Sequence, residues 1–464
     1  MLSKPLLERV LLMALSTGGD FAEVFVEDKY GTNLDMVGGR IETGMSGRDY
    51  GIGIRIFKET NYVYAYTNDD SEANLLKVAK TAADAVAGTK LDIVLDLTKQ
   101  ELVNRHPILR YPGDVPKSDK VAMMLRAYNA AKNYSQVISQ VRVTYLDEDQ
   151  RVQIANSEGL LVEDRRVRTR CSINAIASKG NEKQVGLQGP GAARGFEFYD
   201  EIDIEDYARE AARTAATMID AEPCPSGRFP VIIDNQFGGV IFHEACGHSL
   251  EATSVAKKNS VFADRLGEKI ASDLVTAVDD GTIPNDWGSS NVDDEGTPTR
   301  RNVLIEKGIL KGYMIDKLNG RRMGMAPTGN SRRQSYKFAP TSRMTNTFIV
   351  AGDSTPEEII AATEFGIFAK YMGGGSVVPA TGEFNFAVRE AYMVRDGKIA
   401  EPVRGATLIG KGSEILHHID MIASNQACGQ GMCGSASGSI PANVGQPTLR
   451  VSEITVGGQK GARK

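Results

Sequence analysis

The segment that most constrains the fold of this chain is His243-Glu244-Ala245-Cys246-Gly247-His248, whose two histidines are five positions apart. On a regular helix of 3.6 residues per turn, side chains at this spacing are rotated by about 140° from each other. Both imidazoles can face one point only if the helix is distorted or ends between them. Gly247 is well suited to a helix end or a bulge. We therefore predict a strand at Val231–Asn235, followed by a distorted helix that Gly238-Gly239 opens.

The residue types of this segment are those of a metal site with a general base. The chain has only five His, and roughly 0.007 matches to His-acid-x-x-x-His are expected by chance in such a composition. Two neutral imidazoles can hold a divalent metal, and an adjacent carboxylate that does not bind it can take a proton from metal-bound water. His243 and His248 are therefore candidate ligands, and Glu244 is a candidate base, of a metal-dependent hydrolase. The alternative is that both His are satisfied core residues.

A third metal ligand is expected, because a catalytic zinc usually has three protein ligands and one open position. A thiolate from the glycine-rich stretch Cys428–Gly434 is the most natural donor, since glycine lets the backbone close tightly around a site. Cys246 would point away from a metal held by both histidines. His417 and His418 are expected in a strand, where neighbours point to opposite sides, and are interpreted as structural or substrate-facing. Carboxylates aside, the candidates are Cys171, Cys224, Cys246, Cys428, Cys433, His106, His417 and His418.

Several further segments resemble the TldD branch of the TldD/PmbA metalloprotease family, once described as modulators of DNA gyrase. The resemblance covers nearly the whole chain. In the N-terminal part it rests on Gly51–Arg55 and Tyr64–Thr67. In the C-terminal part it rests on the segment His243–His248, called the His-Glu segment below, and on eight further matches. These are Val278–Pro284, Asp293–Pro298, Arg301–Glu306, Gly308–Met314, Arg343–Thr347, Gly373–Gly375, Gly405–Gly410 and Val444–Thr448.

The resemblance implies a peptidase that cleaves unfolded or leader-type peptides inside a closed chamber. It implies that a metal-bearing TldD subunit pairs with a TldE/PmbA subunit that lacks the motif, and His243, Glu244 and His248 place this chain on the TldD side. It also implies that Cys433, which precedes the Val444–Thr448 segment, is the third ligand. The expected partner is a TldE/PmbA-like subunit or a second copy in a homodimer. The expected cofactor is one divalent metal ion, zinc by its ligand set, with iron as the alternative.

Composition favours a soluble, cytoplasmic enzyme. The formal net charge is −5 with acids and bases interspersed, so the chain lacks the basic footprint of a nucleic-acid-binding protein. The apolar run Val10–Leu15 is too short to span a membrane, and Met1–Ser16 is predicted to be an amphipathic surface helix instead of a signal peptide. An odd number of cysteines, five, argues against a disulfide framework. No nucleic-acid or membrane partner is expected.

The pattern of strands and helices predicts an α+β fold with mixed, largely antiparallel sheets and flanking helices. Three segments are expected: an N-terminal α/β segment at 1–105, a central strand and helix segment at 106–225, and a C-terminal metal-site domain at 226–464. Central strands, turned at 147–149 and 157–159, are predicted at Gln140–Tyr145, Arg151–Asn156, Leu160–Val167 and Arg170–Ser178. Helices are predicted at Ser71–Ala87, Ser118–Lys132 and Ile204–Asp220.

Two acidic clusters and one basic stretch have no clear role from the sequence. Asp279-Asp280 and Asp293-Asp294-Glu295 do not match a calcium loop and are predicted to be turns with solvated carboxylates. The stretch Arg321–Arg333 is predicted to be a mobile loop. The alternative is that this stretch binds the C-terminus or the acidic side chains of a peptide.

Three functions are compatible with these residues. The leading hypothesis is a metal-dependent peptidase with a metal-activated water and Glu244 as general base. A metal-dependent amidase or deacylase acting on small molecules would share the site but would need a narrow pocket. A non-catalytic binding protein with a structural metal would hold that metal with four protein ligands.

Overall fold

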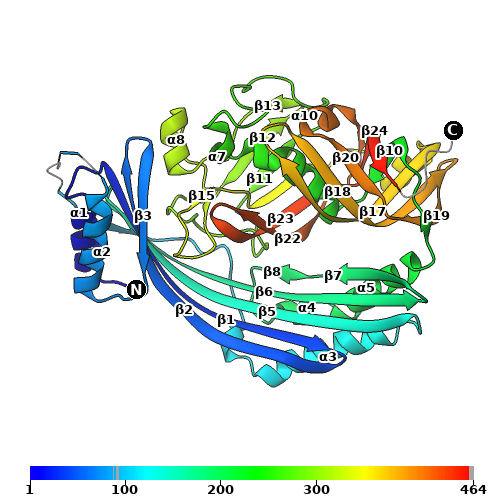
Figure 1. Cartoon of the computed structure of the whole chain (residues 1–464), viewed down its shortest axis with the longest axis horizontal. Helices are drawn as coiled ribbons and strands as arrows, with labels where there is room; N and C mark the ends of the chain where they lie inside the picture. The colour runs from blue at the N-terminus through cyan, green and yellow to red at the C-terminus, as the bar shows by residue number, and fades with distance from the viewer. Residues whose placement is uncertain (87, 90–93, 459–464) are drawn as a thin grey trace.

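A long, curved sheet and a C-terminal body, whose strands lie between Glu222 and Gly457, form the two main parts of the molecule (Figure 1). The computed structural model describes residues 1–86, 88–89 and 94–458. In Figure 1 the C-terminal body lies over the concave side of the sheet, and helix α3 (Lys117–Lys132) lies on the opposite side. The short helix α4 (Phe198–Glu201) contributes to the same apolar cluster as α3. The predicted α+β class with largely antiparallel sheets is confirmed.

The curved sheet joins strands from the first 192 residues in the order β3-β2-β1-β5-β6-β4, and β7 and β8 pair with β6. Its four long strands, β1, β2, β5 and β6, pair with one another in antiparallel fashion, whereas β4 pairs with β6 in parallel. The strands are β1 Phe21–Val37, β2 Arg40–Lys58, β3 Asn61–Thr67, β4 Thr98–Gln100, β5 Ile138–Asn156, β6 Leu160–Lys179, β7 Glu182–Gln188 and β8 Gly191–Ala192.

Alternating side chains give this sheet two different faces. On β1, Val24 and Val26 pack with the helices α1 and α2, whereas Phe25 packs with Val292 and Tyr336 of the C-terminal body. Helices α3 and α5 cover the same face of the sheet as α1 and α2, but at its other end, where Leu34 and Met36 lie on β1. The other helical elements of this part are α1 Lys4–Ala14, α2 Glu72–Asp84, α5 Ile204–Met218 and the 3-10 turn η1 Pro112–Asp114.

The C-terminal body contains two larger sheets with one apolar core between them. The first has the order β17-β10-β24-β20-β18-β19-β9, with β21 on β24, and the second has the order β13-β12-β11-β16-β23-β22. The strands of the first are β9 Glu222–Pro223, β10 Gly227–Ile233, β17 Phe365–Val378, β18 Glu383–Arg395, β19 Lys398–Arg404, β20 Thr407–Lys411, β21 Ile419–Ile422 and β24 Leu449–Gly457. Those of the second are β11 Ala277–Asp280, β12 Arg301–Glu306, β13 Ile309–Leu310, β16 Asn346–Ile349, β22 Ala427–Ser435 and β23 Gly438–Gln446.

Short elements complete this body. The hairpin β14 and β15 stands apart from the two larger sheets, and the His-Glu segment contributes buried side chains to the core between them. The elements are β14 Ser331–Arg332, β15 Thr341–Ser342, α7 Ala252–Val255, α8 Lys317–Met323, α9 Pro356–Ala361, α10 Gly412–Ile415 and the 3-10 turn η5 Leu416–His418.

The prediction of a turn at 147–149 is wrong, because β5 runs through it without interruption. Asp147 is buried and accepts hydrogen bonds from Nζ of Lys120 at 2.6 Å and from the backbone N–H of Thr32 at 3.1 Å. These partners from α3 and β1 satisfy the carboxylate within a continuous strand. The strands predicted separately at Leu160–Val167 and Arg170–Ser178 likewise form one strand, β6. The predicted turn at 157–159 is confirmed.

The acidic clusters are buried, so the prediction of solvated turns is wrong. Asp279 is fully buried and accepts hydrogen bonds from Thr345 and Thr347. Glu295 forms an ion pair with Arg55 of β2, and Asp294 forms one with Arg166 of β6. The second cluster therefore joins the C-terminal body to the curved sheet through buried ion pairs.

Two further predictions need correction. The basic stretch is not one loop: Arg321 lies in α8, and Arg333 is buried with its guanidinium 2.7 Å from Glu23 of β1. His417 and His418 lie in the 3-10 turn η5, before strand β21, and not in a strand.

The remaining helices agree with the sequence. Helix α1 buries Leu7, Val10 and Leu11, and α2, α3 and α5 lie within two or three residues of their predicted bounds, although Ala87 is outside the described residues. Among the described residues, no helix has the length and apolarity that a membrane span requires.

Candidate metal centre

The His-Glu segment lies on a continuous helical stretch whose hydrogen-bond pattern changes at His243. The backbone N–H of His248 donates to the carbonyl oxygen of His243, the i→i+5 bond that defines a π turn. This bond places the two imidazoles near each other and confirms the predicted distortion. The stretch consists of the 3-10 turn η2 Phe237–Gly239, α6 Val240–Phe242, the π turn η3 His243–Gly247 and the 3-10 turn η4 His248–Leu250.

Two glycines let this stretch approach its neighbours closely. A Cβ on Gly239 would lie 2.3 Å from the backbone nitrogen of Gly445 in β23, and a Cβ on Gly247 would lie 2.3 Å from Sδ of Met344. Nonbonded carbon atoms prefer about 3.5–4.0 Å. Glycine at position 239 therefore allows the helical stretch to rest against β23, which pairs with the strand that carries Cys433.

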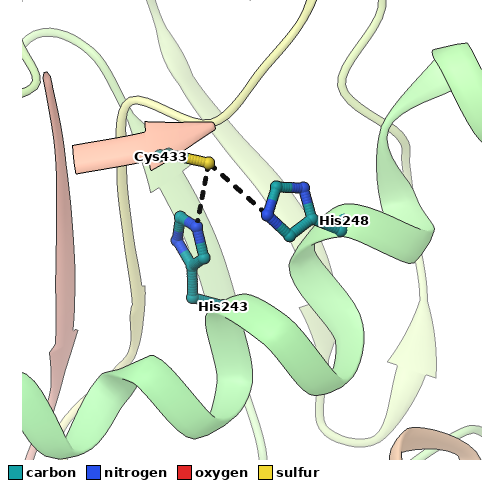
Figure 2. Close-up of side chains that lie close together, drawn as sticks. All are labelled: His243, His248 and Cys433. Carbon is teal, nitrogen blue, oxygen red and sulfur yellow. Dashed lines mark hydrogen bonds between the residues drawn. The ribbon is translucent and has the colours of Figure 1, made fainter. Parts of the chain in front are cut away.

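Cys433 reaches the helical stretch from the hairpin β22–β23, 185 residues after His248. Its Sγ lies 3.3 Å from Nε2 of His243 and 3.4 Å from Nε2 of His248 (Figure 2). Arg343, which is fully buried, donates to the carbonyl oxygens of Cys433 and Gly438. The guanidinium thus holds both strands of the hairpin where the thiol meets the imidazoles.

The three side chains have the geometry of a metal site. One potential ligand atom from each of His243, His248 and Cys433 lies within 4.8 Å of the others. The two rings are nearly perpendicular, at 87°, with centroids 5.0 Å apart. Tetrahedral zinc bonds of about 2.0 Å to nitrogen and 2.3 Å to sulfur would separate the two donors by roughly 3.5 Å. The observed separations of 3.3 and 3.4 Å therefore fit a single ion.

The electrostatics of the cluster favour a thiolate. Burial alone would raise the pKa of Cys433, but the charge and hydrogen bond of His243 and the contacts of His248 outweigh it and hold the pKa well below its usual value. Burial likewise opposes charging of His248, yet Glu251 and Cys433 raise the pKa of His248 well above its usual value. Both directions favour a thiolate beside an imidazolium, and metal binding likewise requires the ionised sulfur.

Two carboxylates flank the cluster. Oε2 of Glu244 lies 3.8 Å from Nε2 of His248, and its side chain is 19% exposed. Glu251, which the sequence reasoning missed, accepts at 3.1 Å from Nδ1 of His248, and its side chain is 5% exposed. A carboxylate on the second nitrogen of a ligand imidazole fixes its orientation. The only sequence signal for this contact was the spacing of three positions between His248 and Glu251. Within the described residues, Nδ1 of His243 is buried without a hydrogen-bond partner.

The other candidate donors are not part of this cluster. Sγ of Cys246 faces the carbonyl oxygen of Gly412 at 3.8 Å, and burial raises the pKa of that thiol. Cys428 lies on β22, but its side chain is packed near Gly445. Nδ1 of His106 accepts from the backbone N–H of Asn285. Cys171, Cys224, His417 and His418 also lie outside the group.

Family comparisons identify the class of protein to which this fold and site belong. Three models match in chain order: PmbA/TldA metallopeptidase domain 1 over residues 22–86, the central domain over 110–219, and the C-terminal domain over 226–458. The chain belongs to the PmbA/TldD metallopeptidase family.

Individual relatives support this membership. A metalloprotease TldD homolog of Haemophilus influenzae is 37% identical over 95% of this chain and 93% of its own length. A zinc metalloprotease TldD homolog of Saccharolobus solfataricus is 26% identical over 95% and 97%. The fold is shared with a DNA gyrase modulator from Thermotoga maritima (TM-score 0.80, 20% identity, 98% and 99% coverage) and with TldE from Thermococcus kodakarensis (0.78, 18%, 97% and 99%).

Proposed function

We propose that this chain is the metal-bearing, catalytic subunit of a peptidase, with His243, His248 and Cys433 as ligands and Glu244 as general base. The observation that carries the proposal is the convergence of three donor atoms beside a partly exposed carboxylate. Three protein donors leave a fourth position for water or substrate, as in catalytic zinc sites.

The proposed mechanism assigns a separate task to each side chain around the ion. A divalent ion held there would polarise the scissile carbonyl and lower the pKa of a bound water toward ~7. Glu244 accepts a proton from the attacking water and passes it to the leaving amine. Glu251 accepts a hydrogen bond from Nδ1–H of His248, which leaves Nε2 of that imidazole available as a metal ligand. Arg343 holds the backbone of Cys433 in place.

We propose zinc as the ion, with iron as the alternative. Two imidazoles and one thiolate suit zinc, and the nitrogen–sulfur separations are close to those of tetrahedral zinc. The name of the relative from Saccharolobus solfataricus, a zinc metalloprotease, supports the same choice.

We propose that the substrates are unfolded or leader-type peptides, and that the site lies in a chamber closed by a second subunit. The proposed partner is a TldE/PmbA-like subunit, with a homodimer as the alternative. The existence of a solved TldE with the same fold supports such a pairing. A closed chamber would keep folded proteins away from the active site, which fits a peptidase among other cellular proteins.

Two other sequence predictions are retained as proposals. The first is the division of the chain into 1–105, 106–225 and 226–464, which the three separate family models support. The second is a cytoplasmic location, supported by five free cysteines, since disulfides are rare in that compartment.

The test uses the zinc-loaded chain and its Glu244→Gln variant, each with and without a TldE/PmbA-like subunit. A protein substrate is supplied both folded and unfolded. We expect cleavage of the unfolded form only, and a fall in kcat of roughly 10²- to 10⁴-fold in Glu244→Gln with its metal retained. Parallel loss of metal and activity would make Glu244 a ligand or a structural residue. Comparable cleavage of both substrate forms would exclude the chamber.

A further inference from the structure

A cavity of about 190 Å³ lies between the curved sheet and the hairpin that carries Cys433. Residues of β5 and β6 form one wall, and Met432 with its cross-strand partner Pro441 forms part of another. Ile440, the cross-strand partner of Cys433, lines the cavity as well. The cavity therefore borders the hairpin directly beside the proposed metal ligand.

Two buried arginines line this cavity without a carboxylate partner. Arg168 and Arg332 are each 7% exposed. Arg168 donates to the carbonyl oxygens of Trp287 and Ser289 at 3.0 and 2.8 Å, and Arg332 donates to the carbonyl oxygen of Met344 at 2.7 Å. In the part of the chain that the structure describes, neither forms an ion pair, whereas the other three cations of the cavity, Lys29, Arg166 and Arg333, each do.

The carboxylates of the cavity are already engaged. Asp294 bonds to Arg166 at 2.5 Å, and Glu148 lies 3.5 Å from Lys29. Asp293 accepts from the backbone N–H groups of Ser331, Glu295 and Thr297. The positive charges of Arg168 and Arg332 are therefore in excess, and an unpaired buried charge is costly.

The pKa values of these two guanidinium groups reflect the same imbalance. Burial, together with the charge of Arg166, lowers the pKa of Arg168 to about 10. Burial, together with the charge of Arg168, lowers the pKa of Arg332 to about 9. An anion between the two arginines would offset both costs.

We propose that this cavity is a subsite for a carboxylate group of the peptide, bound by Arg168 and Arg332; the assignment of a peptide rests on the proposed peptidase function. Guanidinium groups bind carboxylates with paired, charge-assisted hydrogen bonds. The volume suffices for a carboxylate, since a water molecule occupies about 30 Å³ in the liquid. A chain that passes from the metal position across the hairpin can place a C-terminal or side-chain carboxylate here.

The test measures peptide binding in the zinc-loaded Glu244→Gln variant, so that no cleavage intervenes. Three acetylated alanine peptides of equal length are compared by calorimetry: one with a free C-terminus, its C-terminal amide, and the amide with one Glu inside. We expect at least one carboxylate peptide to bind about tenfold to a hundredfold more tightly than the neutral amide. The peptide that does so identifies the source of the carboxylate. Equal binding of all three would overturn the proposal.

Matched substitutions assign the preference to the two arginines. Arg168→Gln and Arg332→Gln, added to Glu244→Gln, should each remove the carboxylate preference. Arg170→Gln is the control, because Arg170 lies on the same strand, β6, and also donates to backbone carbonyl oxygens, those of Gly189 and Gln430, but does not line the cavity. Retention of the preference in Arg332→Gln, or its equal loss in Arg170→Gln, would contradict the subsite.

A competition experiment without arginine substitutions covers the case in which those variants do not fold. N-acetylglycine should displace the tight-binding peptide from the Glu244→Gln chain, whereas N-acetylglycinamide should not. Equal effects of the two compounds would contradict the subsite. Because binding is measured, a chain that cleaves no peptide but discriminates carboxylates would refute the peptidase proposal and leave the anion site standing.

Discussion

The backbone amide of His248 donates to the carbonyl oxygen of His243, and this bond determines where the two imidazoles point. In a regular α-helix the same amide would bond to Glu244, and side chains five positions apart would diverge by about 140°. In the π turn the two rings are instead 5.0 Å apart. The type of helix and the ability to hold a metal are therefore linked.

The proposed ligand set predicts which thiol is needed for metal binding. Cys433→Ser should lose zinc on gel filtration, because it removes one of three donors. Cys428→Ser is the matched control on the same strand, since its sulfur is outside the cluster, and it should keep its zinc. The measurement is elemental analysis of the purified variants. The opposite pattern, with zinc kept in Cys433→Ser and lost in Cys428→Ser, would refute the ligand set.

Glu251 is expected to act as a positioning residue for His248. Glu251→Gln should weaken zinc binding about 10- to 100-fold, because the imidazole loses the charged acceptor of its second nitrogen. Chelator competition gives the affinity, and the thermal unfolding of the metal-free chain serves as the folding control. Glu268→Gln, at a carboxylate paired with Arg265 on the surface, should change neither quantity. An unchanged zinc affinity in Glu251→Gln would show that Glu251 does not position His248 for metal binding.

The close approach of the helical stretch to β23 can be tested with one methyl group. Gly239→Ala should destabilise the fold by about 1–3 kcal/mol and weaken zinc binding, because its Cβ would meet the backbone of Gly445. Gly434→Ala is the control, since a Cβ there meets no atom within 4 Å although Gly434 adjoins Cys433. Denaturant unfolding and zinc titration measure the two effects. Equal effects of both substitutions would show that the contact with β23 determines neither the stability of the fold nor the zinc affinity.

The buried His106 should make stability depend on pH. Burial and the charge of Arg168 lower the pKa of His106 in the folded chain. The unfolded chain therefore binds the proton more readily, and the contribution to stability is present above the ordinary His pKa of about 6.5 and is lost as pH falls below it. The slope due to this group is at most about 1.4 kcal/mol per pH unit.

The measurement for His106 is urea unfolding between pH 5 and 8. His106→Asn keeps an acceptor for the backbone N–H of Asn285 but does not titrate, so its stability should fall less steeply in acid than that of the parent chain. His418→Asn is the control, because His418 lies in the turn η5, away from this buried position. Identical slopes for the parent chain and His106→Asn would exclude a role for His106.

Local signals along the chain predicted much of the fold and the distortion of the motif helix. The spacing of His243 and His248 required a departure from a regular helix, and the alternation of β1 and β5 revealed strands. The continuity of β5 through Asp147 could not be predicted, because the partner that satisfies its carboxylate, Lys120, lies on another element. Periodicity reports burial on one face, but it does not report which charges meet across a tertiary contact.

The same limit applies to the charged clusters and to Glu251. Asp294 resembles a turn residue in the sequence, yet its partner Arg166 is 128 positions away. The ion pair between Glu295 and Arg55 spans an even longer separation, 240 positions. Glu251 carries only a weak local signal, since a carboxylate three positions after a histidine is common on helices. Its role depends on the orientation of His248, which the π turn sets.

The position of Cys433 in the chain has a consequence for biosynthesis. His243 and His248 leave the ribosome 190 and 185 residues before Cys433, the proposed third ligand. Until the hairpin β22–β23 has been made and has folded onto the helical stretch, a nascent chain has only part of the proposed ligand set. The proposed peptidase therefore cannot assemble its reactive centre while its own chain is still largely unfolded, which protects a growing polypeptide from being its own first substrate.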